Sequence, residues 1–186
     1  MAESPEFIKS YLTDLKNVID NVSISDLANI ISVLETALTE KRQVFLAGNG
    51  GSAATAGHMA NDLMLGVAKK QPHGFRAIAL ADHVAPVTAL ANDSDYAEIF
   101  AGQLKHLAQK GDILLVISAS GNSPNIVRAL EEAARLEMQT IAFLGMSGGK
   151  ASGMAQHSVI VQSQGYGPIE DLHMIFDHLI TSYFQQ

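Results

Sequence analysis

Two segments near the start of the chain place apolar residues at helical spacing. The first segment begins at Ser4-Pro5, and its apolar stripe consists of Phe7, Tyr11, Leu12, Leu15, Val18 and Ile19. The second runs from about Ser25 to Lys41, and its stripe consists of Leu27, Ile30, Ile31, Leu34 and Leu38. We therefore expect two amphipathic helices within residues 1–41.

The pattern changes after residue 42, where short and continuously apolar runs alternate with helical segments. These runs predict five strands, at 44–47, 75–80, 113–117, 140–144 and 159–161. Further helices are expected after Ser52, near Pro124, and from Gly167-Pro168 to about Phe184, since proline suits a first helical turn. Such alternation is typical of a mainly parallel sheet covered on both faces. The sequence therefore predicts one α/β domain over 1–186, a three-layer sandwich with its core at 42–186 and two extra N-terminal helices.

Composition excludes several function classes. The formal net charge is −7 and no Lys/Arg cluster is present, which argues against nucleic-acid binding. The absence of cysteine excludes disulfides, thiolate catalysis and Cys-ligated zinc. Met1-Ala2-Glu3-Ser4-Pro5 lacks the apolar run of a secretory signal, and no stretch approaches the ~18 apolar residues of a membrane span. We therefore expect a cytoplasmic protein without nucleic-acid or membrane partners.

Two loops rich in glycine and serine follow the first and third predicted strands. They are Gly48-Asn49-Gly50-Gly51-Ser52 and Ser118-Ala119-Ser120-Gly121-Asn122-Ser123. Ligands of open parallel sheets bind beyond the carboxyl ends of the strands, where both loops are expected. Glycine lets the backbone approach a ligand, and the free N–H groups at the start of the next helix attract an anion. The two loops therefore predict a phosphate site that needs neither Lys nor Arg.

The first loop also fits a dinucleotide-binding pattern, Gly48-x-Gly50-x-x-Ala53, with Asp82 as a candidate ribose partner. This pattern is weak evidence when it stands alone. Because the second loop has more hydroxyl groups than a dinucleotide site requires, we disfavour a nucleotide-dependent oxidoreductase and expect no nucleotide cofactor.

Ionisable side chains gather on two of the predicted helices. His58 and Asp62 are four residues apart and share one helix face. Glu170 and His178 differ by about 80° around the last helix, which favours their convergence on one ligand. A carboxylate and a histidine across a sugar can move the proton that aldose–ketose isomerisation requires. The same four residues also suit a divalent metal such as zinc, and spacing alone does not choose between these roles.

Several motifs together resemble the sugar isomerase (SIS) domain family, and in particular its phosphoheptose isomerases. They are Gly48-Asn49-Gly50-Gly51-Ser52-Ala53, Ala91-Asn92-Asp93, the strand and loop from Gly111-Asp112 to Asn122-Ser123, Gly145-x-x-Gly148-Gly149 and the histidine-bearing last helix. The resemblance covers nearly the whole chain and implies an SIS fold. It also implies a homotetramer with sites at subunit boundaries, in which residues 1–41 serve oligomer packing. The implied reaction converts sedoheptulose 7-phosphate to D-glycero-D-manno-heptose 7-phosphate, for lipopolysaccharide or another surface polysaccharide.

The resemblance assigns roles to individual residues as well. It makes Asp62 the base and His178 the acid, and it implies a possible zinc ion, one per subunit, held by His58, Asp62, Glu170 and His178. The implied substrate contacts are Asn49, Gly50, Gly51, Ser52, Asp62, Asn92, Asp93, Ser118, Ala119, Ser120, Ser123 and Glu170.

Four positions depart from the family pattern. Asp62 stands where glutamate is usual, Ala119 replaces a threonine, Glu170 replaces a glutamine and Gly66 replaces an arginine. The shorter Asp62 side chain withdraws its carboxylate by about 1.5 Å, and a shift of that order costs about 100-fold in rate unless the backbone compensates. The departures leave open an isomerase for another sugar phosphate, a noncatalytic tetramer that binds a replication initiator protein, or a phosphosugar sensor. We favour the isomerase because the ionisable pairs are retained and no DNA-binding segment accompanies the domain.

Overall fold

The computed structural model describes residues 4–186, so Met1, Ala2 and Glu3, which contributed to the prediction about the N-terminus, lie outside the described residues. The strands are β1 (Gln43–Gly48), β2 (Arg76–Ala79), β3 (Ile113–Ser118), β4 (Gln139–Gly145) and β5 (His157–Val161). The helices are α1 (Ser4–Asp20), α2 (Ile24–Thr39), α3 (Gly51–Asn61), α4 (Val84–Asp93), α5 (Ala101–Leu107), α6 (Pro124–Arg135) and α7 (Tyr166–Phe184). Each predicted strand is confirmed to within two residues, whereas α4 and α5 were not predicted individually.

The five strands form one sheet in the order β2-β1-β3-β4-β5, and every pairing is parallel. The predicted parallel α/β architecture is therefore confirmed. The chain moves from β1 outward to β2 and then returns to β3 on the other side of β1. This reversal of strand order creates a crevice beyond the carboxyl ends of β1 and β3, where ligands of such sheets bind.

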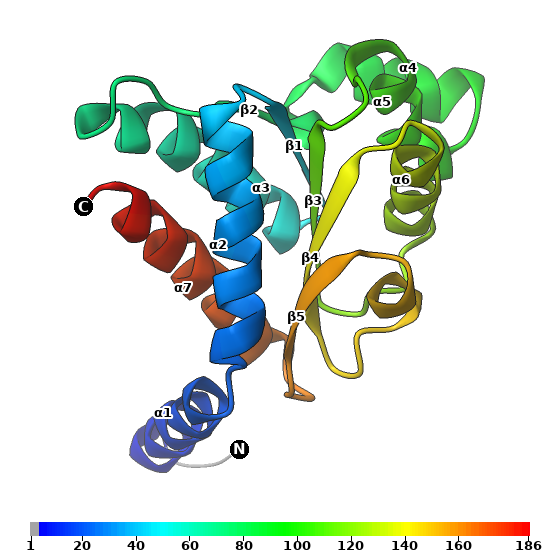
Figure 1. The fold of residues 1–186 in the computed structure, drawn as a ribbon. Helices are drawn as coiled ribbons and strands as arrows, with labels where there is room; N and C mark the ends of the chain where they lie inside the picture. The colour runs from blue at the N-terminus through cyan, green and yellow to red at the C-terminus, as the bar shows by residue number, and fades with distance from the viewer. Residues whose placement is uncertain (1–3) are drawn as a thin grey trace.

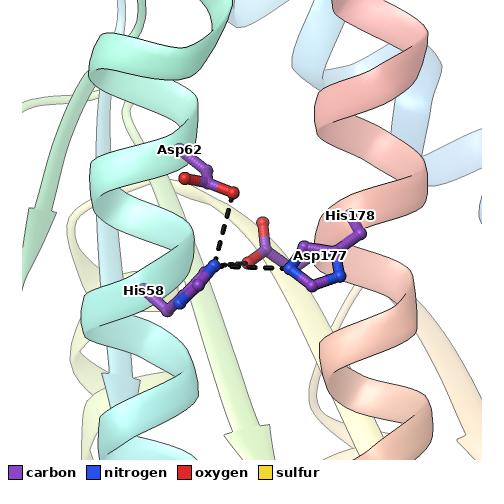
Figure 2. Close-up of side chains that lie close together, drawn as sticks. All are labelled: His58, Asp62, Asp177 and His178. Carbon is purple, nitrogen blue, oxygen red and sulfur yellow. Dashed lines mark hydrogen bonds and ion pairs between the residues drawn. The ribbon is translucent and has the colours of Figure 1, made fainter.

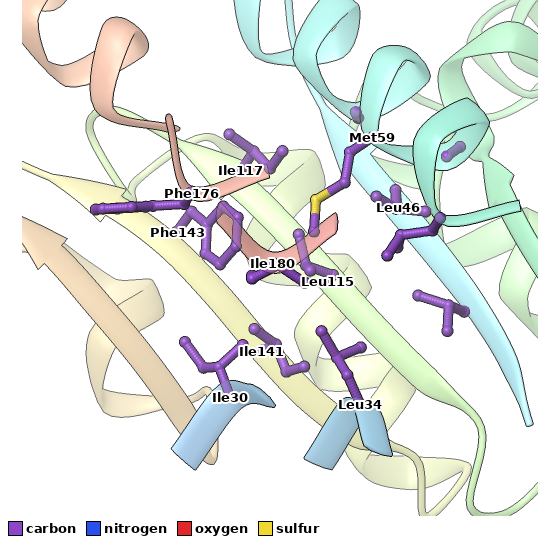
Figure 3. Packing of buried hydrophobic residues seen from close by; sticks show 14 of the residues in the cluster. Ile30, Leu34, Leu46, Met59, Leu115, Ile117, Ile141, Phe143, Phe176 and Ile180 are labelled. Carbon is purple, nitrogen blue, oxygen red and sulfur yellow. The ribbon is translucent and has the colours of Figure 1, made fainter. Parts of the chain in front are cut away.

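Helices cover both faces of the sheet (Figure 1). Alternate side chains of a strand point to opposite faces, so Val44 and Leu46 of β1 pack toward α2, α3 and α7. Phe45 and Ala47 belong to the second apolar cluster, with α5 and α6. Figure 3 shows the first cluster, in which Met59 of α3 and residues of α2 and α7 lie against β1, β3 and β4. The two clusters fix α3 and α7 on one face of the sheet.

The two N-terminal helices differ in how they are packed. α2 buries Leu27, Ile30, Leu34 and Ala37 in the first cluster, so it forms part of the core. The predicted boundary between the N-terminal helices and the core, at residue 41, therefore lies between α2 and the sheet that α2 covers. α1 buries none of its residues, and its Tyr11 hydroxyl donates a 2.5 Å hydrogen bond to Asp171 Oδ2 of α7.

α3 ends in an irregular segment. Asp62–Gly66 is a π-helix, and Val67–Lys69 is a 3₁₀ turn. Within the π-helix, the Leu63 carbonyl accepts a 3.0 Å hydrogen bond from the Phe75 N–H, which lies outside the helix. π-Helical turns are rare and occur frequently at functional sites. Here the turn begins at Asp62, one of the sequence-predicted site residues.

A helix that crosses a bilayer requires about 20 predominantly apolar residues. Across residues 4–186, no single helix is long and apolar enough to cross a membrane; only α1 and α2 taken together, bent by 67°, meet the criteria of length and composition.

Candidate active site

A cavity of about 160 Å³ lies at the carboxyl ends of β1 and β3. It is lined by Asn49, Ser52, Ile117, Ser118, Ala119, Ser120, Ser123, Tyr166 and Glu170. The structure therefore brings the two predicted loops together at the point where the strand order reverses. No Lys or Arg is among the described residues that line this cavity.

Backbone N–H groups at two helix starts give the cavity a partial positive charge. α3 and α6 both begin there, and neither has a side-chain hydrogen bond at its N-cap, Gly50 or Ser123. The first N–H groups of a helix have no partners within it and carry the positive end of the helix dipole. Two uncapped helix starts therefore face one small cavity, an arrangement suited to a phosphate.

Hydrogen bonds within the loop orient the serine hydroxyls of the second motif. Ser118 Oγ accepts the Gly121 N–H at 3.1 Å, and Ser120 Oγ accepts the Asn122 N–H at 3.2 Å. Because each hydroxyl oxygen already accepts a backbone hydrogen bond, its O–H remains available to donate to a ligand. Both hydroxyls can thus add donors to those of the helix starts.

Close backbone contact holds the second loop in place. Gly121 has a φ of +61°, and a Cβ built on it would lie 2.0 Å from the Gly148 carbonyl oxygen. Only glycine fits such an approach without displacement of one backbone by the other. This contact joins the loop after β3 to the Gly148-Gly149 pair after β4 and requires glycine at position 121.

The first loop is held by a pair of side-chain amides. Asn49 and Asn125 exchange hydrogen bonds of 2.9 and 2.8 Å, and the Tyr96 hydroxyl donates to Asn49 Oδ1 at 3.3 Å. Asn49 therefore fixes the loop after β1 to the start of α6. Asn125 and Tyr96 were not in the sequence-predicted site, because neither belongs to a glycine- or serine-rich motif.

Asn92 and Asp93 lie at the end of α4, where the Asn92 amide donates a 2.7 Å hydrogen bond to Asp93 Oδ1. Both side chains are exposed, and neither is among the described residues that line the cavity. Within one chain, the segment after α4 reaches the site through Tyr96 instead.

Four ionisable side chains from α3, its π-helical extension and α7 form a second cluster, shown in Figure 2. His58, Asp62, Asp177 and His178 each offer one nitrogen or oxygen atom, and these atoms lie within 4.8 Å of one another. His58 Nε2 is 3.3 Å from His178 Nε2 and 3.4 Å from Asp62 Oδ2. The predicted grouping of His58, Asp62 and His178 is therefore present in the folded chain.

The cluster has an open side and a buried floor. His58 is 46% exposed at its side chain and Asp62 is 24% exposed, whereas Asp177 is fully buried. Burial, together with the nearby Asp62 carboxylate, raises the pKa of Asp177 to about 6. Ligands can therefore approach the two histidines and Asp62 from solvent, with Asp177 beneath them.

Glu170, which was predicted to be a metal ligand, is not part of this cluster. A Cβ built on Gly51 would lie 2.8 Å from both Glu170 carboxylate oxygens, so this side chain lies over the start of α3 and lines the cavity. A rise of about 12 Å along α7 separates Glu170 from His178, so within one chain Glu170 lies apart from the cluster. Asp177 supplies the second carboxylate of the cluster. Its position immediately before His178 in the sequence is the feature from which it could have been predicted.

The cavity and the cluster lie along the same two helices. α3 and α7 run side by side in the same direction, with Ser52 and Glu170 at the cavity. Farther along, His58 and His178 meet in the cluster. The helical rise over these six to eight residues is about 9 to 12 Å. One extended ligand can thus have its anionic end in the cavity and its other end at the cluster.

Comparisons with known proteins agree with this geometry. Residues 6–145 match the family model described as the SIS domain. The chain is 39% identical to the phosphoheptose isomerase of Nitratiruptor sp., over 83% of this chain and 81% of the relative. It is 34% identical to the probable phosphoheptose isomerase of Thermoplasma acidophilum, over 94% and 95%. Its fold matches the structure of a phosphoheptose isomerase from Francisella tularensis with a TM-score of 0.90, at 31% identity and full coverage of both chains.

Proposed function

The chain belongs to the SIS-domain family, in its phosphoheptose isomerase group, and from this premise we propose that it converts sedoheptulose 7-phosphate to D-glycero-D-manno-heptose 7-phosphate. It is a sugar-phosphate isomerase. The observation that carries the choice of substrate is the pairing of a phosphate-type cavity with an acid–base cluster on the same two helices.

The separation of the two sites fits a long sugar phosphate. The helical rise between cavity and cluster, about 9 to 12 Å, is comparable to the span from the phosphorus of an extended heptose 7-phosphate to its first two carbons. With the phosphate at the starts of α3 and α6, the reacting carbons then reach His58, Asp62 and His178. A short sugar phosphate bound in the same cavity would leave its reacting carbons away from the cluster.

The isomerisation requires a proton to move between two neighbouring carbons and another to move between their oxygens. We assign the first transfer to Asp62, whose carboxylate takes a proton from C1 of the ketose to give an enediol and returns it to C2. We assign the second to His178, which gives a proton to the oxygen on C2 and receives one from the oxygen on C1. A carboxylate paired with a histidine provides this general acid–base chemistry. Asp62 Oδ2 faces His58, and Oδ1 accepts a 3.1 Å hydrogen bond from the Asn61 amide.

The cluster also fits a divalent cation, and zinc is our choice. Two imidazoles and two carboxylates form a donor set that zinc accepts, and one carboxylate oxygen of Asp177 is buried without a hydrogen-bond partner. When bound, such a cation would supply Lewis-acid polarisation of the sugar carbonyl. We propose one zinc ion per subunit.

A homotetramer is part of the same proposal, and α1 supports it. This helix buries no residue in its own chain and exposes the large apolar side chains of Phe7, Ile8, Leu12 and Ile19. A contiguous apolar face of this kind marks an interaction site. We propose that α1 packs in the oligomer, together with whichever parts of α2 remain accessible. A cytoplasmic location and a role in surface-polysaccharide synthesis remain predictions.

The experiment that tests the function is turnover of sedoheptulose 7-phosphate by purified protein, assayed after chelation and again with added zinc. We expect an aldoheptose phosphate as product and a loss of about 10²- to 10⁴-fold in rate for Asp62→Asn, because the amide cannot accept the proton. Glu137→Gln is the matched control, since this exposed carboxylate pairs only with Lys110 at the surface. Retained turnover in Asp62→Asn would remove it as the base. No turnover by folded wild-type protein that binds the sugar phosphate would show that the substrate is different.

A further inference from the structure

Asn122 lies in the serine-rich loop after β3, and its side-chain amide bonds to backbone groups at both of its ends. Asn122 Nδ2 donates a 3.0 Å hydrogen bond to the Ser120 carbonyl oxygen. Asn122 Oδ1 accepts a 3.1 Å hydrogen bond from the Lys150 N–H. The side chain is exposed and is not among the described residues that line the cavity. The amide therefore binds the backbone of its own chain, outside the cavity.

The two backbone groups that Asn122 binds follow neighbouring strands of the sheet. Ser120 comes directly after β3, whereas the 3₁₀ turn Lys150–Gly153 comes after β4. One backbone hydrogen bond also joins these segments, from the Ala151 N–H to the Gly121 carbonyl oxygen at 3.0 Å. Asn122 thus adds a side-chain link between the cavity loop and a segment that β4 holds in place.

Close packing confines the Asn122 amide. Gly149 has a φ of +54°, and a Cβ built on it would lie 2.7 Å from Asn122 Nδ2. A larger residue at position 149 would displace the amide, and its backbone conformation would also be strained. The glycine therefore provides the space that the Asn122 side chain occupies.

Ser120 is the residue of the cavity that Asn122 holds. The backbone N–H of Asn122 donates to Ser120 Oγ at 3.2 Å, and the side-chain amide of Asn122 binds the Ser120 carbonyl oxygen. One residue thus fixes both the hydroxyl oxygen and the peptide group of Ser120, which lines the cavity. A donor that is already held in place loses less conformational entropy when a ligand binds, so its hydrogen bond contributes more to affinity.

We propose that Asn122 is a positioning residue for the phosphate of the substrate, and that its amide holds Ser120 so that the Ser120 hydroxyl donates into the cavity. The inference rests on the phosphate site of the proposed function. It does not depend on which sugar carries the phosphate. Because the Asn122 side chain does not contact the ligand in this assignment, its effect on binding must pass through Ser120.

The test measures binding of inorganic phosphate and of sedoheptulose 7-phosphate to the full-length protein, with Kd taken from the rise of Tm with ligand concentration. Asn122→Ala should weaken the binding of both ligands by about 3- to 10-fold, because the hydroxyl donor remains but is less well held. Gln156→Ala is the matched control. The exposed Gln156 also uses its side-chain amide to bind backbone, since its Oε1 accepts the Thr140 N–H at 3.0 Å, but it lies at the amino end of β4, away from the cavity. Its removal should leave both Kd values within about twofold of the wild type.

The double variant Ser120→Ala/Asn122→Ala shows whether Asn122 acts through the Ser120 hydroxyl. In the Ser120→Ala background, loss of the amide should change each Kd by less than about twofold, because the hydroxyl that the amide positions is already absent. A merely structural role would instead make the two separate effects multiply. Circular dichroism establishes that each variant is folded. If Asn122→Ala does not fold, Asn122→Asp takes its place in the same cycle, since it retains the acceptor for the Lys150 N–H and loses the donor to Ser120.

Three results would overturn the assignment. They are wild-type affinity for phosphate in the Asn122 variant, effects of Ser120 and Asn122 that multiply in the double variant, and a wild-type protein that binds neither ligand. Binding of inorganic phosphate is measured without turnover, so the outcome is separate from the proposed reaction. A protein that shows the expected cycle with inorganic phosphate but does not isomerise the heptose phosphate would retain this inference and lose the proposed function.

Discussion

The free energy of unfolding should depend on pH through His173 of α7, and replacement of this residue by phenylalanine should remove that dependence. The His173 side chain is fully buried, and neither ring nitrogen has a hydrogen-bond partner of good geometry. The nearby Leu144 backbone raises the pKa of the ring, but its effect is smaller than that of burial. Phe143 and Phe176 are its aromatic neighbours. Burial lowers the pKa of His173 from 6.5 to about 4.

The sign follows from the two states. The folded chain keeps the ring neutral down to about pH 4, whereas the unfolded chain binds a proton below about pH 6.5. The stability associated with His173 is therefore fully present above pH 6.5 and is lost as the pH falls toward 4. Between pH 8 and pH 5 the loss is about 2 kcal/mol, and over the whole window it is about 3 kcal/mol.

Urea unfolding of the wild-type protein and His173→Phe at pH 8, 7, 6 and 5 measures this loss. Protein concentration is held constant, because association contributes to apparent stability. Asp177, whose pKa is raised to about 6, acts in the opposite direction, but it is present in both proteins and so cancels from their difference. The variant should gain about 2 kcal/mol over the wild type between pH 8 and pH 5. Stability curves that stay parallel across this range would show that His173 is not held neutral by burial.

Two further predictions concern the serine-rich loop. Ser120→Ala removes one hydroxyl donor and should weaken binding of the sugar phosphate by about 10- to 100-fold, since hydrogen bonds to charged groups contribute about 1.5 to 3 kcal/mol. Titration calorimetry measures the affinity for the sugar phosphate, and an unchanged affinity would exclude the hydroxyl as a phosphate ligand. Gly121→Ala should destabilise the fold by about 2 kcal/mol or more in thermal unfolding, because its φ is +61° and the new Cβ would lie 2.0 Å from the Gly148 oxygen. Gly153→Ala has open space at the corresponding position and is the matched control, so equal stability of the two variants would contradict the steric reasoning.

The fold was predictable because apolar periodicity reports directly on burial. The five predicted runs became five parallel strands, since residues apolar along their whole length suit strands covered on both faces. α4 and α5 were missed because neither has a sharp apolar stripe: α4 buries none of its residues, and α5 has only seven residues. The packing of α2 in the core was also not predicted, because a helix before the first strand carries no sequence signal for the face of the sheet that it covers.

The phosphate-type cavity was predictable for a related reason. Glycine and serine directly after a buried strand indicate a loop whose backbone closely approaches a ligand or another part of the chain. The loops after β1 and β3 meet because the carboxyl ends of neighbouring parallel strands lie at one edge of the sheet. Asn125 and Tyr96 escaped notice because they contact Asn49 across long stretches of sequence.

The sequence by itself determined the parallel α/β fold, the two loops of the cavity, and the pairing of His58 with Asp62 on one helix face. Those features follow from local periodicity and from short spacings, which a chain carries in its own order of residues. The tertiary structure alone decided which carboxylate of α7 joins that pair. Helical spacing gives the angle between two side chains, but the packing of α3 against α7 sets the level at which they meet. That level places Glu170 at Gly51 and Asp177 beneath His58.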